Sequence, residues 1–219
     1  MAKELGTLFG IAASGKDTVL RSMSENPHLK RIVNDTTRAP RDGEIDGLDY
    51  HFISDEEHEI IKKNNRYLTF TEEKGRHYGV RKSEITIAWK QNKIPVGHFG
   101  LKDHLNLWQQ SDAGNFDCKS IFLSVPSHEI WVSRMENRVN TGFITEQEMQ
   151  LRGEEAAKEY SFLANNIGRF AVILSNEGRS SKTTEDCINY YLYGKKPEID
   201  HNYIEHIIHS FDVYGSKDE

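Results

Sequence analysis

Hydrophobic runs alternate with amphipathic runs along most of the chain. The stretches between the apolar runs carry charged and apolar residues at helical spacing, and no internal repeat or low-complexity linker interrupts them. This order predicts an α/β fold with a mostly parallel sheet and helices on both of its faces. The predicted core strands are Leu5–Phe9, Arg31–Asn34, Ile94–Phe99, Ser120–Val125 and Phe170–Ser175.

Two capping boxes predict where longer helices begin. Ser54 is followed three residues later by Glu57, ahead of an amphipathic run through Lys63, and Thr145 is followed in the same way by Glu148. In such a box each residue's side chain accepts a hydrogen bond from the other residue's backbone N–H. Two short strands are predicted around a turn at Gly75, at Tyr67–Thr71 and His77–Val80.

A glycine-rich loop follows the first predicted strand and precedes a helix predicted over Val19–Met23. Its sequence is Gly10-Ile11-Ala12-Ala13-Ser14-Gly15-Lys16-Asp17-Thr18. Such a loop points backbone N–H groups and the positive end of the helix at bound phosphate. Its lysine reaches the outer phosphates of a nucleoside triphosphate. We therefore predict that ATP is bound by Gly10, Ala12, Ala13, Ser14, Gly15, Lys16, Asp17 and Thr18.

The loop departs from the strict P-loop pattern at one position. Asp17 stands where a metal-binding hydroxyl is expected, and Thr18 follows one place later. Because Mg²⁺ favours oxygen ligands, both residues are candidate metal ligands. The alternative is that Asp17 caps the first helix and that Thr18 alone serves the phosphates.

A second polar segment, from Thr36 to Phe52, carries paired arginines. Arg38 and Arg41 are held apart by a proline and present fixed forks suited to a doubly charged phosphate. Tyr50 can donate its hydroxyl to the same phosphate, and Glu44 can orient an arginine. A separate group of basic residues consists of Arg134, Arg138 and Arg152. The first two are one helical turn apart.

The order of these motifs, from about Leu5 to Tyr193, resembles the guanylate kinases. The resemblance implies one domain over residues 1–219, with a core of 1–34, 91–136 and 156–193. It implies a nucleoside-monophosphate-binding subdomain at 35–90, a lid at 137–155 and a C-terminal extension at 194–219. In the family, lid arginines close over the phosphates being transferred. Phosphoryl transfer needs such positive groups, because charge spreads over the moving phosphoryl group in the transition state. Catalytic roles are thereby implied for Lys16, Arg38, Arg138 and Arg152. The alternative for the lid arginines is pairing with Glu136, Glu146 and Glu155 on a solvated helix.

Two further matches extend the resemblance. The segment from Gly75 to Gly79 looks like the family's Gly-x-Tyr-Tyr-Gly turn, in which Tyr78 matches the phosphate-binding tyrosine. Ser175-Asn176 resembles the Val-Asn that ends the last core strand near the adenine of ATP. The resemblance thus adds Asn176 to the residues that bind ATP and Tyr78 to those that bind the acceptor.

The departures concern the acceptor base. The family's guanine-reading glutamate falls on Thr69, its guanine-reading serine or threonine on Val80, and a further serine near the base on Asn34. The family's Asp-x-Gln-Gly is also missing, because Gly97-His98-Phe99-Gly100 stands in its place. Glu73 shares the strand face of Thr69, so a shifted register could restore an acid. We predict acceptor binding by Asn34, Arg38, Arg41, Glu44, Tyr50, Thr69, Tyr78 and Val80, with weakened or altered base selectivity.

Composition narrows the class of protein. A formal charge of −6 and a pI near 5.9 argue against a nucleic-acid partner, since such binders show a basic surface. No apolar run approaches the ~20 residues that span a membrane, and the N-terminus lacks a signal-peptide pattern. Cys118 and Cys187 form no metal-ligand pattern. These features predict a reduced, cytoplasmic protein. We separately expect a monomer or homodimer that acts on small nucleotides, without a nucleic-acid or membrane partner.

The function predicted is an ATP- and Mg²⁺-dependent phosphotransferase of nucleotide metabolism. It moves the γ-phosphoryl group of ATP to GMP, dGMP or another nucleoside or deoxynucleoside monophosphate. A kinase of another phosphate ester remains an alternative, because Gly-Lys-Asp-[Ser/Thr] occurs in ribose bisphosphate phosphokinases. Those lack the Thr-Thr-Arg-x-Pro-Arg run found at Thr36–Arg41. A non-catalytic guanylate-kinase-like binding module is a second alternative, although such modules typically lose the phosphate loop.

Overall fold

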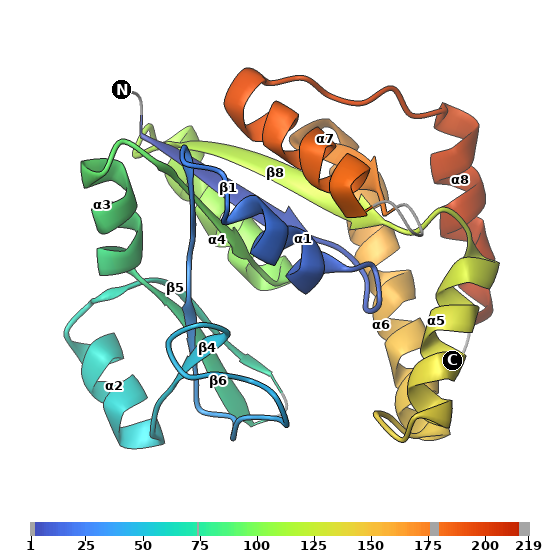
Figure 1. Cartoon of the computed structure of the whole chain (residues 1–219), viewed down its shortest axis with the longest axis horizontal. Coiled ribbons are helices and arrows are strands. Elements are labelled where there is room, and N and C mark those ends of the chain that lie inside the picture. Colours follow the sequence, from blue (N-terminus) through green and yellow to red (C-terminus); the bar gives the residue numbers. More distant parts are fainter. Residues whose placement is uncertain (1–2, 74, 176–179, 215–219) are drawn as a thin grey trace. The chain divides into compact units, whose positions relative to one another are not determined.

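The computed structural model describes residues 3–73, 75–175 and 180–214 of the chain (Figure 1). The chain forms two compact units. The first unit consists of Met1–Thr7 and Ser24–Lys119, and the second of Leu8–Met23 and Ser120–Glu219. Strands β1 (Glu4–Phe9) and β8 (Asp117–Ser124) contribute residues to both units.

The other elements each belong to one unit. The first unit contains β2 (Leu29–Arg31), β3 (Asn34–Thr36), β4 (Tyr50–Phe52), α2 (Asp55–Lys63), β5 (Tyr67–Glu73), β6 (Arg76–Arg81), α3 (Lys82–Lys90), β7 (Ile94–His98) and α4 (Leu101–Asp112). The second contains α1 (Lys16–Met23), α5 (His128–Asn140), α6 (Glu146–Asn165), η1 (Ile167–Arg169), β9 (Phe170–Leu174), α7 (Ser180–Tyr193), α8 (His201–Ser210) and η2 (Asp212–Tyr214).

The larger sheet has five strands in the order β2-β7-β1-β8-β9. The pairs β2–β7 and β8–β9 are both parallel. Helices flank this sheet, and within the second unit α1 and α7 pack side by side (Figure 1). The predicted α/β class with a mostly parallel sheet is confirmed.

Four of the five predicted core strands are present as β1, β7, β8 and β9, with no end shifted by more than three residues. The prediction of a single strand over Arg31–Asn34 is wrong, because that segment belongs to β2 of the larger sheet and β3 of the smaller one. The N–H of Ile32 still bonds to Val96, whereas Asp35 is fully buried in the smaller sheet. The chain therefore changes sheets between Arg31 and Asn34.

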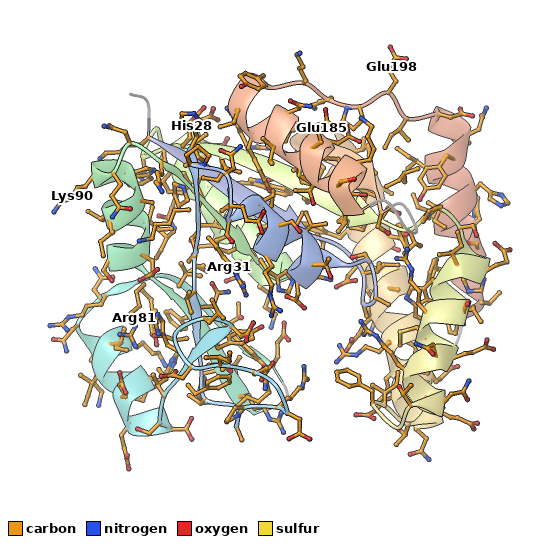
Figure 2. All side chains as sticks on the ribbon, in the orientation of Figure 1. His28, Arg31, Arg81, Lys90, Glu185 and Glu198 are labelled. Carbon is orange, nitrogen blue, oxygen red and sulfur yellow. The ribbon has the colours of Figure 1, made fainter. Side chains whose placement is uncertain are left out.

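The smaller sheet has the order β4-β3-β6-β5, and its register defines two faces. Directly opposite residues share a face, as do alternate residues along a strand. One face carries Asp35 and Arg81, whose Nε donates to both carboxylate oxygens of Asp35 at 2.9 and 2.7 Å. Arg81 is labelled in Figure 2, and its Nη2 also bonds to Glu57 of α2. This face is covered by α2.

The opposite face carries five of the residues predicted from the sequence to bind the acceptor. Asn34 is opposite Tyr50, and Thr69 is opposite Val80. Thr36, two residues from Asn34, is opposite Tyr78, which lies two residues from Val80. The acceptor face is therefore defined by Asn34, Tyr50, Thr69, Tyr78 and Val80.

The helix starts predicted from capping residues are confirmed. Ser54 precedes α2, and its Oγ accepts from the N–H of Glu57 at 3.1 Å. Thr145 and Glu148 form the reciprocal capping box at the start of α6. Both helices thus begin where local side-chain chemistry satisfies their first backbone N–H groups.

The C-terminal residues of the second unit pack on α5 and α6. Phe211 is fully buried against Trp131 and Tyr160, with ring centroids 5.1 and 5.0 Å away. The ring of Tyr214 lies so close to Gly153 that a Cβ there would stand 2.4 Å from it. Gly153 is therefore a contact point between α6 and the end of the described chain.

Candidate functional site

The glycine-rich loop connects β1 to α1 in the second unit. Gly10 has φ +144°, and a Cβ on it would stand 2.1 Å from the carbonyl oxygen of Leu123 in β8. Gly15 has φ +90°, and Ala13, although not a glycine, has φ +61°. Only glycine fits at Gly10, because both the backbone conformation and the space exclude a side chain. The loop is thus held against β8 through its backbone.

Lys16 is the first residue of α1 and folds over the loop. Its Nζ donates to the carbonyl oxygens of Gly10 at 2.5 Å and Ile11 at 2.8 Å. Burial lowers the pKa of Lys16, while the negative charges of Glu159 and Asp17 oppose this change. The ammonium group therefore lies next to the loop that would hold phosphate, in a partly dehydrated position where its charge acts strongly.

The loop is braced from α5 by two side chains. Trp131 donates from Nε1 to the carbonyl of Ala12 at 3.1 Å. Arg134 donates from Nη1 to the carbonyl of Ala13 and to Oγ of Ser175, both at 2.9 Å. The sequence grouped Arg134 with the basic residues but did not assign it to the loop. The one feature of the sequence that pointed to a role for Arg134 was its position one helical turn before Arg138.

The two predicted lid arginines act on Lys16 through space. Both Arg138 and Arg152 lower the pKa of Lys16 by charge repulsion, to a smaller extent than burial does. The Arg138 guanidinium lies 5.7 Å from the ring centroid of Phe143. Arg152 pairs with Glu155 at 2.7 Å on the partly exposed surface of α6. The predicted pairing with a helical glutamate is thus present for Arg152, and both arginines also influence Lys16.

The second unit contains groups suited to ATP and Mg²⁺. The Oγ of Ser14 is buried within the loop and has no hydrogen-bond partner among the described residues. Asp17 and Thr18 are exposed at the start of α1 and offer the oxygen donors that a hard cation prefers. No cluster of three or more His, Cys, Asp or Glu suited to a metal occurs within residues 3–73, 75–175 and 180–214. These residues fit a metal held jointly by the loop and by phosphate. Asn176, predicted to bind ATP, lies outside the described residues.

In the first unit, Arg38 and Glu44 form a bidentate ion pair. Nη1 and Nη2 of Arg38 donate to the two carboxylate oxygens at 2.7 and 2.9 Å, and Arg38 is only 5% exposed. Hydrogen bonding to Arg38 lowers the pKa of Glu44, and the same bond raises the pKa of Arg38. Glu44 also accepts from the backbone N–H of Arg41 at 2.7 Å, while the Arg41 residue is exposed. One carboxylate therefore fixes both arginine positions.

Two tyrosines accompany this pair. The Arg38 guanidinium lies 5.2 Å from the ring centroid of Tyr50, whose ring is 6.3 Å from that of Tyr78. Because Tyr50 and Tyr78 share the acceptor face, the structure brings two phenols and a guanidinium together in one unit. This combination of donors suits a phosphate dianion.

The remaining acceptor residues differ from one another in surroundings. Val80 is 2% exposed and packs in the hydrophobic core with Leu5 and Phe99. Asn34 donates to the carbonyl of His98 at 3.0 Å, but its buried Oδ1 has no partner among the described residues. Thr69 donates from Oγ1 to Oδ1 of Asp103 at 2.7 Å, and Thr69 is only 5% exposed.

Asp103 is a buried residue that the sequence motifs did not identify. It lies in the first turn of α4, and its Oδ2 accepts from the N–H of Gly100 at 3.1 Å. Burial raises the pKa of this carboxyl group. From the sequence alone, an aspartate three residues into a helix predicts an ordinary cap.

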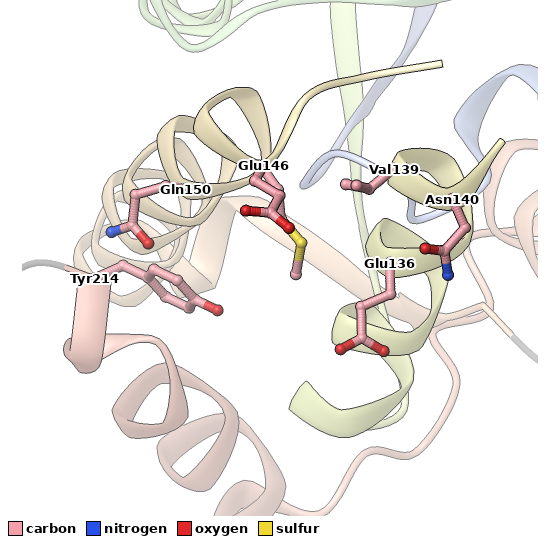
Figure 3. A pocket seen from close by; sticks show the side chains of 7 residues that line it. Glu136, Val139, Asn140, Glu146, Gln150 and Tyr214 are labelled. Carbon is pink, nitrogen blue, oxygen red and sulfur yellow. The ribbon is translucent and has the colours of Figure 1, made fainter. Parts of the chain in front are cut away.

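A pocket of about 580 Å³ lies elsewhere in the second unit, between α5, α6 and Tyr214 (Figure 3). Its lining includes Glu136 and Glu146, and none of the site residues predicted from the sequence. It is therefore separate from the phosphate loop.

Comparisons with known proteins relate this chain to one family. The family model described as guanylate kinase matches residues 5–186. The guanylate kinase of Mycoplasmopsis pulmonis is 33% identical over 158 residues, covering 69% of this chain and 78% of the relative. That of Clostridium tetani is 31% identical over 156 residues, covering 71% of each. The crystal structure of guanylate kinase from Anaplasma phagocytophilum is similar in fold, with a TM-score of 0.63, 19% identity and coverage of 90% of this chain and 88% of that one. None of the helices in the described part of the chain is long and apolar enough to span a bilayer.

Proposed function

Because the chain belongs to the guanylate kinase family, whose members are ATP-dependent nucleoside monophosphate kinases, we propose that it transfers the γ-phosphoryl group of ATP to GMP or dGMP. Other deoxynucleoside monophosphates are acceptors to be tested beside them. The observation that carries the proposal is the presence of a braced phosphate loop with Lys16 in one unit and the Arg38–Glu44 pair with two tyrosines in the other.

The donor residues act mainly through backbone N–H groups and charge. The loop from Gly10 to Thr18 holds the ATP phosphates, and Lys16 stabilises the charge on the transferred group. Arg138 and Arg152 add positive charge to the same phosphates, consistent with their influence on Lys16. Bound Mg²⁺ supplies charge neutralisation of the phosphates.

The acceptor residues act through side chains. Arg38, Arg41, Tyr50 and Tyr78 bind the acceptor phosphate, and Glu44 orients Arg38. We also propose the division into a core, an acceptor subdomain at 35–90, a lid at 137–155 and an extension at 194–219. In support, segment 35–90 lies wholly in the first unit and segment 137–155 wholly in the second. We expect a monomer or homodimer. We also expect it to be cytoplasmic, in keeping with Cys118 and Cys187, neither of which is in a disulfide.

An assay of ADP release across GMP, dGMP, AMP, dCMP, dTMP and dUMP tests this function. Robust turnover with at least one of them is the expected result. Turnover only with a sugar phosphate, or binding of nucleotides without turnover, contradicts the proposal and favours one of the two alternative functions.

We further propose that Asp17 contributes to metal binding at the loop. The residue is exposed at the start of α1, and Gly97-His98-Phe99-Gly100 supplies no acid after the middle strand. In Asp17→Asn, the Mg²⁺ concentration that gives half-maximal activity is expected to rise several-fold. An unchanged Mg²⁺ dependence would assign Asp17 to helix capping.

A further inference from the structure

Asp103 is a carboxylate in an unusual environment. It is 8% exposed, and the groups that influence its pKa are the Thr69 hydroxyl, the Gly100 N–H and the negatively charged Glu73. An ionised carboxylate carries about four acceptor sites, and two are filled here by Thr69 and Gly100. Leaving buried acceptors unfilled is unfavourable, so the group is suited to receive further N–H donors.

The position of Asp103 relates it to the acceptor face. Its partner Thr69 is opposite Val80 on β6, and continuing the β3–β6 register places Asn34 on the other side of Val80. Asn34 and Thr69 are therefore separated by two strand spacings, roughly 10 Å. The unpartnered Oδ1 of Asn34 provides a second buried acceptor in this row. At Asn34 the row also meets Tyr50, which lies beside Arg38 of the proposed phosphate site.

A second carboxylate lies close by. A Cβ on Gly100 would stand 3.5 Å from both Oδ2 of Asp103 and Oε1 of Glu73. Glu73 is on the same face of β5 as Thr69, because the two are separated by an even number of residues. Burial and, to a smaller extent, the negative charge of Glu73 raise the pKa of Asp103. Two neighbouring carboxylates favour hydrogen-bond donors over acceptors in this region.

We infer that Asp103, held by Thr69, is the residue that reads the guanine base of the proposed acceptor, by accepting its N–H groups. Guanine presents an N1–H and a 2-amino group side by side, which match the two free acceptor sites of one carboxylate. Adenine and cytosine place a ring acceptor beside their amino group, and uracil and thymine flank their N–H with two carbonyls. Those edges would set an acceptor against Asp103, which disfavours them strongly.

This inference rests on the proposed kinase function and specifies which residue of this chain reads the acceptor base. It also changes an expectation from the sequence, which predicted weakened base selectivity because Thr69, Val80 and Asn34 carry no charge. Asp103 supplies the missing carboxylate from α4 instead of from β5. Thr69 is then a positioning residue, and Asp103 is the residue that contacts the base.

The test compares GMP, IMP and AMP, since IMP lacks only the 2-amino group. For the wild-type protein we expect kcat/KM for GMP to exceed that for AMP by ~10³-fold or more. In Asp103→Asn we expect a loss of ~10²-fold with GMP, a smaller loss of ~10-fold with IMP and little loss with AMP. Asp112→Asn is the matched control, because it makes the same change at an exposed position of the same helix. It should leave all three values within about twofold.

Equilibrium binding of GMP and IMP without ATP separates this inference from the kinase function. If the protein shows no turnover but binds GMP better than IMP, and Asp103→Asn removes that preference, the proposed kinase function is contradicted and the role of Asp103 is supported. Equal losses for GMP, IMP and AMP in Asp103→Asn, or no loss, would overturn the base assignment. If Asp103→Asn does not fold, Thr69→Val removes only the hydroxyl that holds the carboxylate. It should raise KM for GMP more than for AMP with kcat little changed, and an equal effect on both would also overturn the assignment.

Discussion

The two proposed phosphate-binding regions, one in each unit, are built by different means. The loop in the second unit is shaped by backbone conformation, with Gly10 pressed against Leu123 and carbonyls of the loop bonded to Lys16, Trp131 and Arg134. The proposed acceptor site in the first unit is instead shaped by side chains, above all the bidentate pair of Arg38 and Glu44.

This difference has a consequence for substitutions. A backbone-built loop tolerates changes of side chain that keep its conformation, but it depends on the one side chain that supplies charge, Lys16. A side-chain-built site distributes its binding over several partners, so a single change weakens binding and leaves part of it in place.

The largest effect on activity is expected from Lys16→Ala. Its ammonium group is the charge that α1 brings onto the loop, and removing one preorganised donor of this kind lowers kcat by ~10²-fold or more. Turnover is measured at saturating ATP and acceptor. Lys182→Ala, which removes an exposed lysine paired with Asp186 on α7, serves as the control and should retain activity. Near-normal kcat in folded Lys16→Ala would contradict the role of the loop.

An effect of about 2 kcal/mol is expected on the stability of the first unit at low pH. His104 is fully buried, with Nε2 bonded to Thr7 and Nδ1 to the carbonyl of Gly100. Burial lowers the pKa of His104 to about 4. The unfolded chain therefore takes up a proton near pH 6.5, and the folded chain does not. Stability from this residue is complete above that pH and is lost as the pH falls toward 4, by about 2 kcal/mol at pH 5.

The measurement is the free energy of unfolding at pH 7 and pH 5, in the wild type and in His104→Gln. Glutamine retains a donor and an acceptor but does not titrate, so the variant should lose less stability between the two pH values. The other histidines contribute equally to both proteins. The same loss in both would show that His104 is not responsible.

The sequence predicted the loop better than the acceptor site, and the reason is the range of the interactions. Gly10, Gly15 and Lys16 are close in the chain, so their spacing alone indicates a strand, a tight turn and a following helix. The helix itself begins at Lys16, three residues before the predicted Val19. Asp103 lies 34 residues from its partner Thr69, and only the packing of α4 against β5 brings them together. No spacing rule contains that information.

The strand error at Arg31–Asn34 has a similar origin. The β-branched pair Ile32-Val33 favours a strand, but it does not indicate the sheet in which each neighbouring residue pairs. The buried Asp35 and its partner Arg81 lie 46 residues apart. Their ion pair belongs to the smaller sheet, which only the folded chain reveals.

A smaller effect, of ~10-fold, is expected from Glu44→Gln. The amide keeps one acceptor for Arg38 but loses the charge and the bidentate geometry, so the guanidinium is less fixed. We expect KM for the acceptor to rise about tenfold, with KM for ATP unchanged, since Glu44 lies in the first unit. Asp42→Asn, an exposed change in the same loop, is the control. A rise in KM for ATP as large as that for the acceptor would contradict a separate acceptor site.

The smallest effect is expected from Arg152→Ala, which separates two roles for one arginine. Arg152 forms an ion pair with Glu155, and the two side chains are 40% and 37% exposed. Surface ion pairs of this kind contribute about 0–1 kcal/mol to stability. The unfolding free energy should therefore hardly change. Arg152 also acts on Lys16 by charge repulsion, so its loss should lower kcat several-fold if it stabilises the transferred phosphoryl group. Glu155→Ala breaks the same ion pair and keeps the arginine, so it should preserve kcat. Equal losses of kcat in the two variants would assign Arg152 to the surface of α6 and leave the transferred charge to Lys16 and Arg138.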